Sequence, residues 1–204
     1  MTFSIDDLVM DFVEKDYAPE RKEPKEGVYF EFEVKSCVIK VAKAGHLMAK
    51  VTVEALDANG DSMFPQWINF ALPVSVGDMT PPDYAKKIFL GTMRALKPEN
   101  AAYDIKQQDP VSKKWNYFKE GEPVNTKDYD LAIIDQNRAN ALVAREMATA
   151  FIEADADEAA YDGLNGNRFF ARVEKKGDFT NVKGLEVGLP EGTPVVYDRS
   201  EAFA

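Results

Sequence analysis

Strict alternation between apolar and charged residues is the feature that most constrains how this chain can fold. After Gly27, an apolar set alternates with a charged set, namely Phe30, Phe32 and Val34 with Glu31, Glu33 and Lys35. Because successive side chains of a β-strand point to opposite faces, this period of two predicts a strand with one face in a core. The alternation continues at Cys37, Ile39 and Val41 after a slip of one residue near Ser36, which predicts a β-bulge.

Two turn signals divide the next part of the chain into strands. The sequence KAG at residues 43–45 predicts a turn into a second strand over residues 47–56. The sequence DANGD at residues 57–61 is a strong hairpin signal, because asparagine and glycine tolerate the positive φ of tight turns. It leads into a third strand over residues 64–72, so three consecutive antiparallel strands open the folded part of the chain.

The middle of the chain changes to a helical pattern. In residues 80–98, Thr80 can cap a helix and Pro81 fits its first turn, while the apolar stripe consists of Tyr84, Ile88 and Leu96. Residues 98–127 are mostly polar and predict an extended loop or a small hairpin. A second helix is predicted over about residues 135–154, followed by a helical turn that ends at Gly163. Its apolar side consists of Ala141, Leu142, Ala144, Met147, Ala148 and Phe151.

Two short strands complete the pattern. Residues 168–174 alternate, the sequence KKGD at residues 175–178 predicts a turn, and residues 179–185 form the last strand. Three strands, a helix, an insertion and a closing hairpin follow the layout of an OB barrel. The predicted fold is therefore mainly β with added helices: a five-stranded OB-type antiparallel barrel over residues 27–185, with the helix between strands 3 and 4 and an insertion at about 98–160.

The two ends of the chain are interpreted separately. Residues 1–26 predict an N-terminal helix, with Ile5, Leu8, Val9 and Phe12 at helical spacing, and a charged linker that contains proline. Residues 186–204 are interpreted as a C-terminal tail. The N-terminal residues carry acids where a secretory signal peptide needs bases, and no stretch has the roughly 20 apolar residues of a membrane helix, which predicts a soluble intracellular protein.

Charge is segregated along the sequence. The formal net charge of -10 disfavours a polyanionic ligand at first sight, since affinity for phosphates comes mainly from lysine and arginine. Residues 2–20 and 120–162, however, hold 17 of the 35 acids and only four of the 25 lysines and arginines. The remaining sequence is slightly basic, with clusters such as Lys40, Lys43 and Lys50. This distribution favours a basic groove beside acidic surfaces, although a merely solvated acidic surface gives the same composition.

Two blocks of the sequence resemble a known family. The opening GVYFEFEVKSCVIKVAKAGHLMAKVTVEALDANGD and the closing LNGNRFFARVEKKGDFTNVKGL resemble the ends of bacteriophage single-stranded DNA-binding and recombination-accessory proteins of the OB-fold type. The resemblance implies a protein that coats single-stranded DNA during phage replication or recombination in the cytoplasm of an infected bacterial cell. It also implies contacts with other phage replication or recombination proteins through an acidic tail. The end of this chain, YDRSEAFA, departs from that pattern because it carries only two acids.

Aromatic residues out of phase with the core mark the predicted DNA-binding face. In the third strand Ile68, Phe70 and Leu72 share one face, which places Trp67, Asn69 and Ala71 on the other. In the fourth strand Phe169, Ala171 and Val173 point inward, which places Phe170 outside between Arg168 and Arg172. Such a mixture suits single-stranded DNA, since bases stack on rings while cations hold phosphates. Burial of Trp67 and Phe170 under the inserted helix is the alternative.

Further candidates for DNA binding flank these strands. The predicted interface also includes Lys50, the hairpin residues Lys175, Lys176, Phe179 and Lys183, and the insertion residues Lys113, Lys114, Trp115 and Tyr117. The insertion aromatics either close over DNA or anchor the loop as a satellite core. The alternative function is an OB-fold protein-interaction module whose exposed aromatics bury against a partner protein. Arginines beside Phe170 favour DNA, because the core of a protein interface is depleted of most charges.

Catalytic signatures are absent from the sequence. His46 is the only histidine, and no second histidine or cysteine stands at metal-ligand spacing. Cys37, the only cysteine, lies in an apolar run and is predicted to be a buried structural thiol. No phosphate-binding loop of the form G-x-x-x-x-G-K-[ST] occurs. We therefore expect no enzyme activity, no metal and no cofactor.

Overall fold

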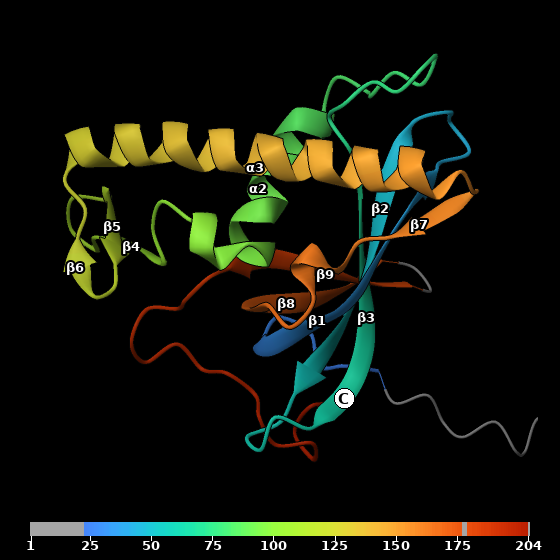
Figure 1. Ribbon diagram of the computed structural model, residues 1–204. Coiled ribbons are helices and arrows are strands. Elements are labelled where there is room, and N and C mark those ends of the chain that lie inside the picture. The colour runs from blue at the N-terminus through green and yellow to red at the C-terminus, as the bar shows by residue number, and fades with distance from the viewer. Residues whose placement is uncertain (1–22, 177–178, 204) are drawn as a thin grey trace, which may run out of the picture.

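A twisted antiparallel sheet forms the centre of the protein (Figure 1). The computed structural model describes residues 23–176 and 179–203, apart from the side chains of Lys176 and Phe179. The sheet contains β1 (Tyr29–Val41), β2 (Leu47–Leu56), β3 (Ser62–Ala71), β8 (Arg168–Lys176) and β9 (Phe179–Glu186), in the order β3-β2-β1-β8-β9. A short strand, β7 (Glu158–Ala160), pairs with β1. The prediction of a mainly β, antiparallel fold is confirmed.

The register of β1 against β2 contains the irregularity that the sequence predicts. Val34 pairs with Val53, but Ser36 pairs with Thr52, so the register shifts by one residue between Val34 and Ser36. This confirms the bulge predicted near Ser36. It allows both halves of β1 to face the core, since Phe32 before the bulge and Cys37 after it are buried.

The sheet is not closed into a full ring of hydrogen-bonded strands. Among the described residues, β3 and β9 are the two ends of the paired path, and no backbone pairing joins them. The closed barrel expected from the sequence is therefore not confirmed. β3 contains Pro65, which lacks a backbone N–H and favours an edge position. A side-chain hydrogen bond still links the two edges, because the Thr180 hydroxyl donates to Oε1 of Gln66 over 3.1 Å.

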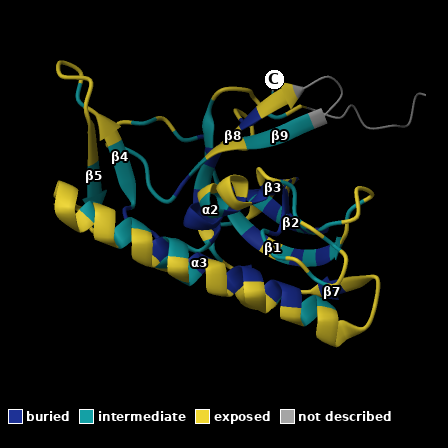
Figure 2. Cartoon of the chain, turned by 90° about the horizontal axis from the view of Figure 1, so that it is seen from above, coloured by how far each residue is buried: buried dark blue, intermediate teal, exposed yellow. Residues whose placement is uncertain are grey.

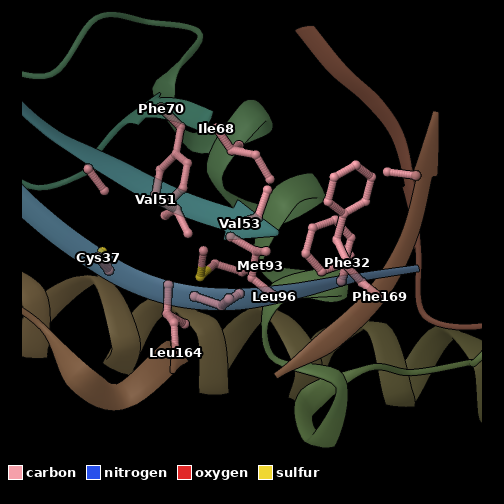
Figure 3. Packing of buried hydrophobic residues seen from close by; sticks show 14 of the residues in the cluster. Phe32, Cys37, Val51, Val53, Ile68, Phe70, Met93, Leu96, Leu164 and Phe169 are labelled. Carbon is pink, nitrogen blue, oxygen red and sulfur yellow. The ribbon is translucent and has the colours of Figure 1, made fainter. Parts of the chain in front are cut away.

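Aromatic rings fill the core inside the sheet (Figure 3). Phe32 of β1 stacks on Phe169 of β8 with ring centroids 5.7 Å apart. Phe30 meets Phe64 of β3 edge-to-face at 5.2 Å. Cys37 lies in the same core, where burial raises the pKa of its thiol to about 12. The predicted burial of Cys37 is confirmed.

Helix α2 (Ala85–Leu96) packs against this core with a face that shares only Leu96 with the predicted apolar stripe. Phe89, Met93 and Leu96 are buried, and Phe89 contacts Phe70 at 5.7 Å between ring centroids. Tyr84 and Ile88, assigned to the apolar stripe from the sequence, are exposed. The predicted Thr80 cap and the placement of Pro81 in the first turn are also wrong, because α2 begins only at Ala85. Pro82 disfavours the helical conformation of Pro81 before it. Tyr84 occupies the N-cap position and makes no side-chain cap hydrogen bond.

The insertion is more ordered than a loop or a single hairpin. It contains a 3-10 turn, η1 (Pro98–Asn100), and three strands, β4 (Ile105–Gln108), β5 (Trp115–Lys119) and β6 (Glu122–Pro123), that form a small sheet. It then continues into α3 (Thr126–Ala154), a helix of 29 residues. At a rise of about 1.5 Å per residue, α3 is roughly 43 Å long.

Helix α3 begins earlier than Asp135, the start expected from the sequence. The side chain of Asn125 caps it by accepting hydrogen bonds from the backbone N–H groups of Lys127 and Asp128, each over 3.1 Å. α3 lies across α2, with the insertion sheet near one end and β7 near the other (Figure 1). Exposed residues recur along its length (Figure 2), and they include Ala141 and Leu142, both assigned to the apolar side from the sequence.

The remaining segments connect these elements. The predicted helical turn near Gly163 is η2 (Asp162–Leu164). After β9 the chain returns to the start of β1, where Pro24 pairs with Phe203. The ring of Phe203 packs on Phe64 at 5.6 Å, so the last described residues contact the core. Within residues 23–176 and 179–203, no helix combines the length and the apolar run that a membrane crossing requires.

Candidate nucleic-acid interface

An exposed tryptophan and a lysine lie side by side on the outer face of β2 and β3. Trp67 of β3 is 49% exposed, and its neighbours Ile68 and Gln66 point inward and are buried. The ammonium group of Lys50 on β2 lies 5.6 Å from the centroid of the Trp67 ring. Lys50 pairs with Asn69 across the two strands, so Trp67, Lys50 and Asn69 form one continuous surface, which we call the β2–β3 face.

The predicted phase of the third strand is confirmed for two of its three outward residues. Trp67 and Asn69 are exposed as the alternation requires. Ala71 was expected on the same face, but it is buried. Ala71 is the last residue of β3, opposite Met48, and the strand ends there, so strict alternation no longer fixes its environment.

A hollow of about 580 Å³ lies beside the β2–β3 face. Its lining includes the bases Lys40, Lys43 and Lys50 and the acids Asp157 and Glu158. Lys40 is held by Glu158, with 3.6 Å between the ammonium nitrogen and a carboxylate oxygen. Among the described residues, Lys43 and Lys50 have no ion-pair partner. Lys50 beside Trp67 and Lys43 in the hollow are therefore available to an external anion.

The outer face of β8 has the predicted residues but a different electrostatic character. Phe169, Ala171 and Val173 are buried, which confirms the predicted phase of this strand. Arg168 is exposed but pairs with two carboxylates of β1, Glu33 at 3.0 Å and Glu31 at 3.7 Å.

The other members of the β8 set are also engaged. The Arg172 guanidinium lies 5.3 Å from the ring centroid of Tyr29. Phe170, between the two arginines, is half-buried. A hydrogen bond from Lys35 and then one from Arg168 lower the pKa of Glu33, so this carboxylate stays charged and continues to hold its partners. The β8 surface consequently presents less free positive charge than its sequence indicates.

The cations of the closing hairpin have acidic partners as well. Lys183 forms an ion pair with Glu174 at 2.7 Å, and this contact lowers the pKa of Glu174. Lys175 pairs with Glu23 at 2.6 Å. The side chains of Lys176 and Phe179, also predicted to bind DNA, lie outside the described residues.

The insertion places its predicted residues on a separate surface. Lys113 and Lys114 are exposed at the turn between β4 and β5, and Trp115 beside them is 51% exposed. The ring of Tyr117 instead packs between Tyr129 and Tyr103, with centroids 4.2 Å and 4.7 Å away. Tyr117 therefore belongs to a satellite core that anchors the insertion, whereas Trp115 faces outward. The views in Figures 1 and 2 place this small sheet at one end of α3, away from β2.

The predicted DNA-binding set left out residues that complete the surface around Trp67, although the alternation had placed Asn69 on the same face. Met48 and Asn69 line the hollow together with Lys40 and Lys43. Alternation in β2 would have identified Met48, because it stands in phase with Lys50 and out of phase with buried Leu47 and Ala49. Lys43 belongs to the turn between β1 and β2, where no periodicity indicates a direction.

Neither a metal-binding cluster in the described part of the chain nor a matching relative adds to this geometry. Among the described residues, no group of three or more histidine, cysteine, aspartate or glutamate side chains is placed to hold a metal ion. Comparisons with protein-family models, with curated proteins and with solved structures each found no match to this chain. The β2–β3 face itself is therefore the feature that indicates a function.

Proposed function

We propose that this chain binds single-stranded DNA without sequence preference and supports DNA replication or recombination of a bacteriophage, without being an enzyme. The observation that carries the proposal is the half-exposed Trp67 ring on an outward sheet face, accompanied by Lys50. The proposed interface is the β2–β3 face together with the lysines of the neighbouring hollow.

The strand order supports an OB-type barrel that is partly open. The path β3-β2-β1-β8-β9, with α2 between β3 and β8, follows the strand order of that fold, and the Thr180–Gln66 hydrogen bond lies where the barrel would close. OB folds bind oligonucleotides on the face of their second and third strands and on the adjoining loops. Trp67, Lys50 and Lys43 occupy these positions in the chain.

The chemistry of the β2–β3 face suits a flexible, unpaired strand. An exposed indole can stack on any base, which is worth about 1–3 kcal/mol per base and requires no particular sequence. Lys43 and Lys50 can neutralise phosphates, and the amide of Asn69 can both donate and accept hydrogen bonds. In a duplex the bases already stack on each other, so this face would gain only the phosphate contacts. We therefore expect a preference for single-stranded over duplex DNA.

An alternative function is a protein-interaction module of the same fold. The observation that favours it is the pairing of Arg168 with Glu31 and Glu33, which removes the charge that first distinguished this surface from a protein interface. The lysines beside Trp67 favour DNA, because the core of a protein interface is depleted of lysine.

Fluorescence titration with oligo(dT) and with a duplex of equal length tests the proposal. Trp67→Ala should weaken binding to oligo(dT) by about 1–3 kcal/mol, roughly 5- to 150-fold in Kd, because the stacking platform is removed. Trp115→Ala is the matched control, since it removes a similarly exposed tryptophan from the distant insertion and should leave Kd unchanged. A thermal melt of each variant shows whether it is folded.

Salt dependence separates charge from stacking in the same titration. The logarithm of affinity should fall linearly with the logarithm of salt concentration, by about 0.7 per phosphate neutralised. Lys50→Ala should reduce this slope, whereas Lys183→Ala should not, because Lys183 is paired with Glu174. Equal affinity for duplex and single strand, or unchanged binding by Trp67→Ala, would refute the proposed face. Absence of DNA binding would favour the protein-interaction module.

A further inference from the structure

A groove with an apolar floor and basic rim lies between α2 and α3. Its volume is about 560 Å³, and its floor includes Val74 after β3, Leu90 of α2 and Ile134 of α3. Ile134 is 47% exposed, so the two helices leave part of their apolar surface uncovered. We call this site the α2–α3 groove.

Three cations surround the apolar floor. Lys86 projects from α2, while Arg138 and Arg145 project from α3, and all three are exposed. Arg138 has a solvent-exposed contact with Asp135 at 3.4 Å, which contributes little in water. Among the described residues, Lys86 and Arg145 have no ion-pair partner. The groove therefore complements a ligand that is apolar on one side and acidic on the other.

One segment of the chain has this combination of properties. Residues 2–20 carry six acids and one lysine, and Ile5, Leu8, Val9 and Phe12 stand at the spacing of an amphipathic helix. This segment lies outside the described residues, so the expectation comes from its sequence alone. An amphipathic helix that places its apolar side into a groove is a recurrent mode of recognition. Here the acids beside that stripe would meet Lys86, Arg138 and Arg145.

The position of Glu23 and Pro24 sets the distance that the segment must span to reach the groove of its own chain. Glu23 pairs with Lys175 and Pro24 with Phe203, near the start of β1. The groove is lined by Val74, which lies just beyond the other end of β3. β3 has 10 residues, so these places are about 30 Å apart. Residues 14–22 span at most about 30 Å when fully extended, and a path around the surface is longer than the straight line.

We propose that the N-terminal segment of one copy of this chain binds in the α2–α3 groove of a second copy. A second copy can be approached from any direction, so binding to it does not require residues 14–22 to span this distance. The contact is heterologous, because segment and groove are different surfaces, and it can join copies head to tail. The proposal is independent of DNA binding, since neither Trp67 nor Lys50 takes part.

Sedimentation velocity on full-length variants tests this proposal without DNA. The segment variant Leu8→Ser/Phe12→Ser loses apolar contacts, and the groove variant Ala141→Glu/Arg145→Glu places carboxylates where the acidic segment would bind. We expect the parent chain to self-associate at micromolar concentration, and each variant alone to show a dissociation constant at least about tenfold higher. Leu131→Ser is the control, because Leu131 is an exposed apolar residue of α3 that does not line the groove.

Mixing the two variants identifies the occupant of the groove. In the mixture, the intact segment of the groove variant can bind the intact groove of the segment variant, so heterodimers should form at concentrations where each variant alone stays monomeric. Failure of the mixture to associate would overturn the proposal and would favour docking of the segment on its own chain. A parent chain that remains monomeric at all concentrations would also overturn it. Each variant should melt at the same temperature as the parent chain, which shows that a loss of association is not caused by a loss of folding.

Discussion

A buried ion pair between α2 and β9 provides the sharpest test of how the insertion is attached to the sheet. Arg94 donates to Glu186 over 2.6 Å and to the backbone carbonyl of Leu185 over 3.0 Å, and both charged side chains are buried. The Arg94 guanidinium also lies 4.6 Å from the centroid of the Tyr103 ring. Lys106 of β4 contacts the other Glu186 oxygen at 2.9 Å, so helix, sheet and insertion meet at this pair.

Removal of one partner leaves the other charge buried without compensation. Such single changes cost about 3–5 kcal/mol, whereas replacing both charges by apolar residues is often neutral or stabilising. The loss of unfolding free energy caused by Arg94→Met should be near 3 kcal/mol, because the half-exposed Lys106 still neutralises Glu186. Glu186→Leu should fall nearer to 5 kcal/mol, because Arg94 then keeps only the Leu185 carbonyl and the Tyr103 ring. The double variant should be less destabilised than either single variant.

Urea denaturation of the four proteins measures the coupling between the two residues. In thermal melts of the same proteins, each kcal/mol of lost stability lowers Tm by about 2–4 °C for a domain of this size. Each single variant should therefore melt roughly 6–20 °C below the parent. If the two single effects add in the double variant, the residues are not coupled, and the assignment of Arg94–Glu186 as a mutually compensating buried pair is refuted.

Two further predictions concern the core. Phe169→Ala should cost about 3–5 kcal/mol of unfolding free energy because it opens a cavity beside Phe32, whereas Phe170→Ala, at a half-buried position, should cost less than about 2 kcal/mol. If Phe170→Ala melted at a lower temperature than Phe169→Ala, the inward and outward faces of β8 would be the reverse of those described. In the folded chain the pKa of the Cys37 thiol is about 12, whereas in the unfolded chain the thiol loses its proton near pH 9. The free energy of unfolding should therefore fall as pH rises between these two values. Cys37→Ala should lack this part of the pH dependence. Thiol labelling at pH 8 should be much faster in urea than in buffer; equal rates would show that Cys37 is not buried.

The strands were predictable because their signal is local. The alternation in residues 29–41 depends only on which side of the strand is buried, and the predicted bounds of β2 agree with Leu47–Leu56. Helix boundaries were less accurate, because they depend on which face finds a partner. In α2, Ile88 and Phe89 are both apolar, and only the contact of Phe89 with Phe70 decides which of them is buried.

The start of α3 was missed for a related reason. Its first turns carry few residues on a buried face, since they extend past the sheet towards the insertion. A local signal for this start was nevertheless present in the sequence. Asn125 is a favourable capping residue, and Asp128, three residues later, is an acid in the first helical turn.

The candidate site shows the same limit at a longer range. Sequence alternation correctly placed Arg168 and Arg172 on the outer face of β8. It did not show that β8 lies beside β1 in a register that sets Arg168 opposite Glu33. That neighbour is 135 residues away in sequence, so the neutralisation of Arg168 depends on strand pairing that no local pattern contains.

The same strand pairing places acids and bases at opposite ends of the outer face of the sheet. Glu33 and Glu54 are cross-strand partners near the start of β1, and Lys35 contacts both. Lys40 and Lys43 lie at the other end of the strand, beside the hollow and Lys50. A polyanion laid across the sheet from β3 to β8 would meet the carboxylates of Glu31 and Glu33, and hydrogen bonds from Lys35 and Arg168 lower the pKa of Glu33. If Trp67 is the stacking platform, a bound strand is therefore expected to leave it towards the turn between β1 and β2, where phosphates meet lysines with fewer competing acids.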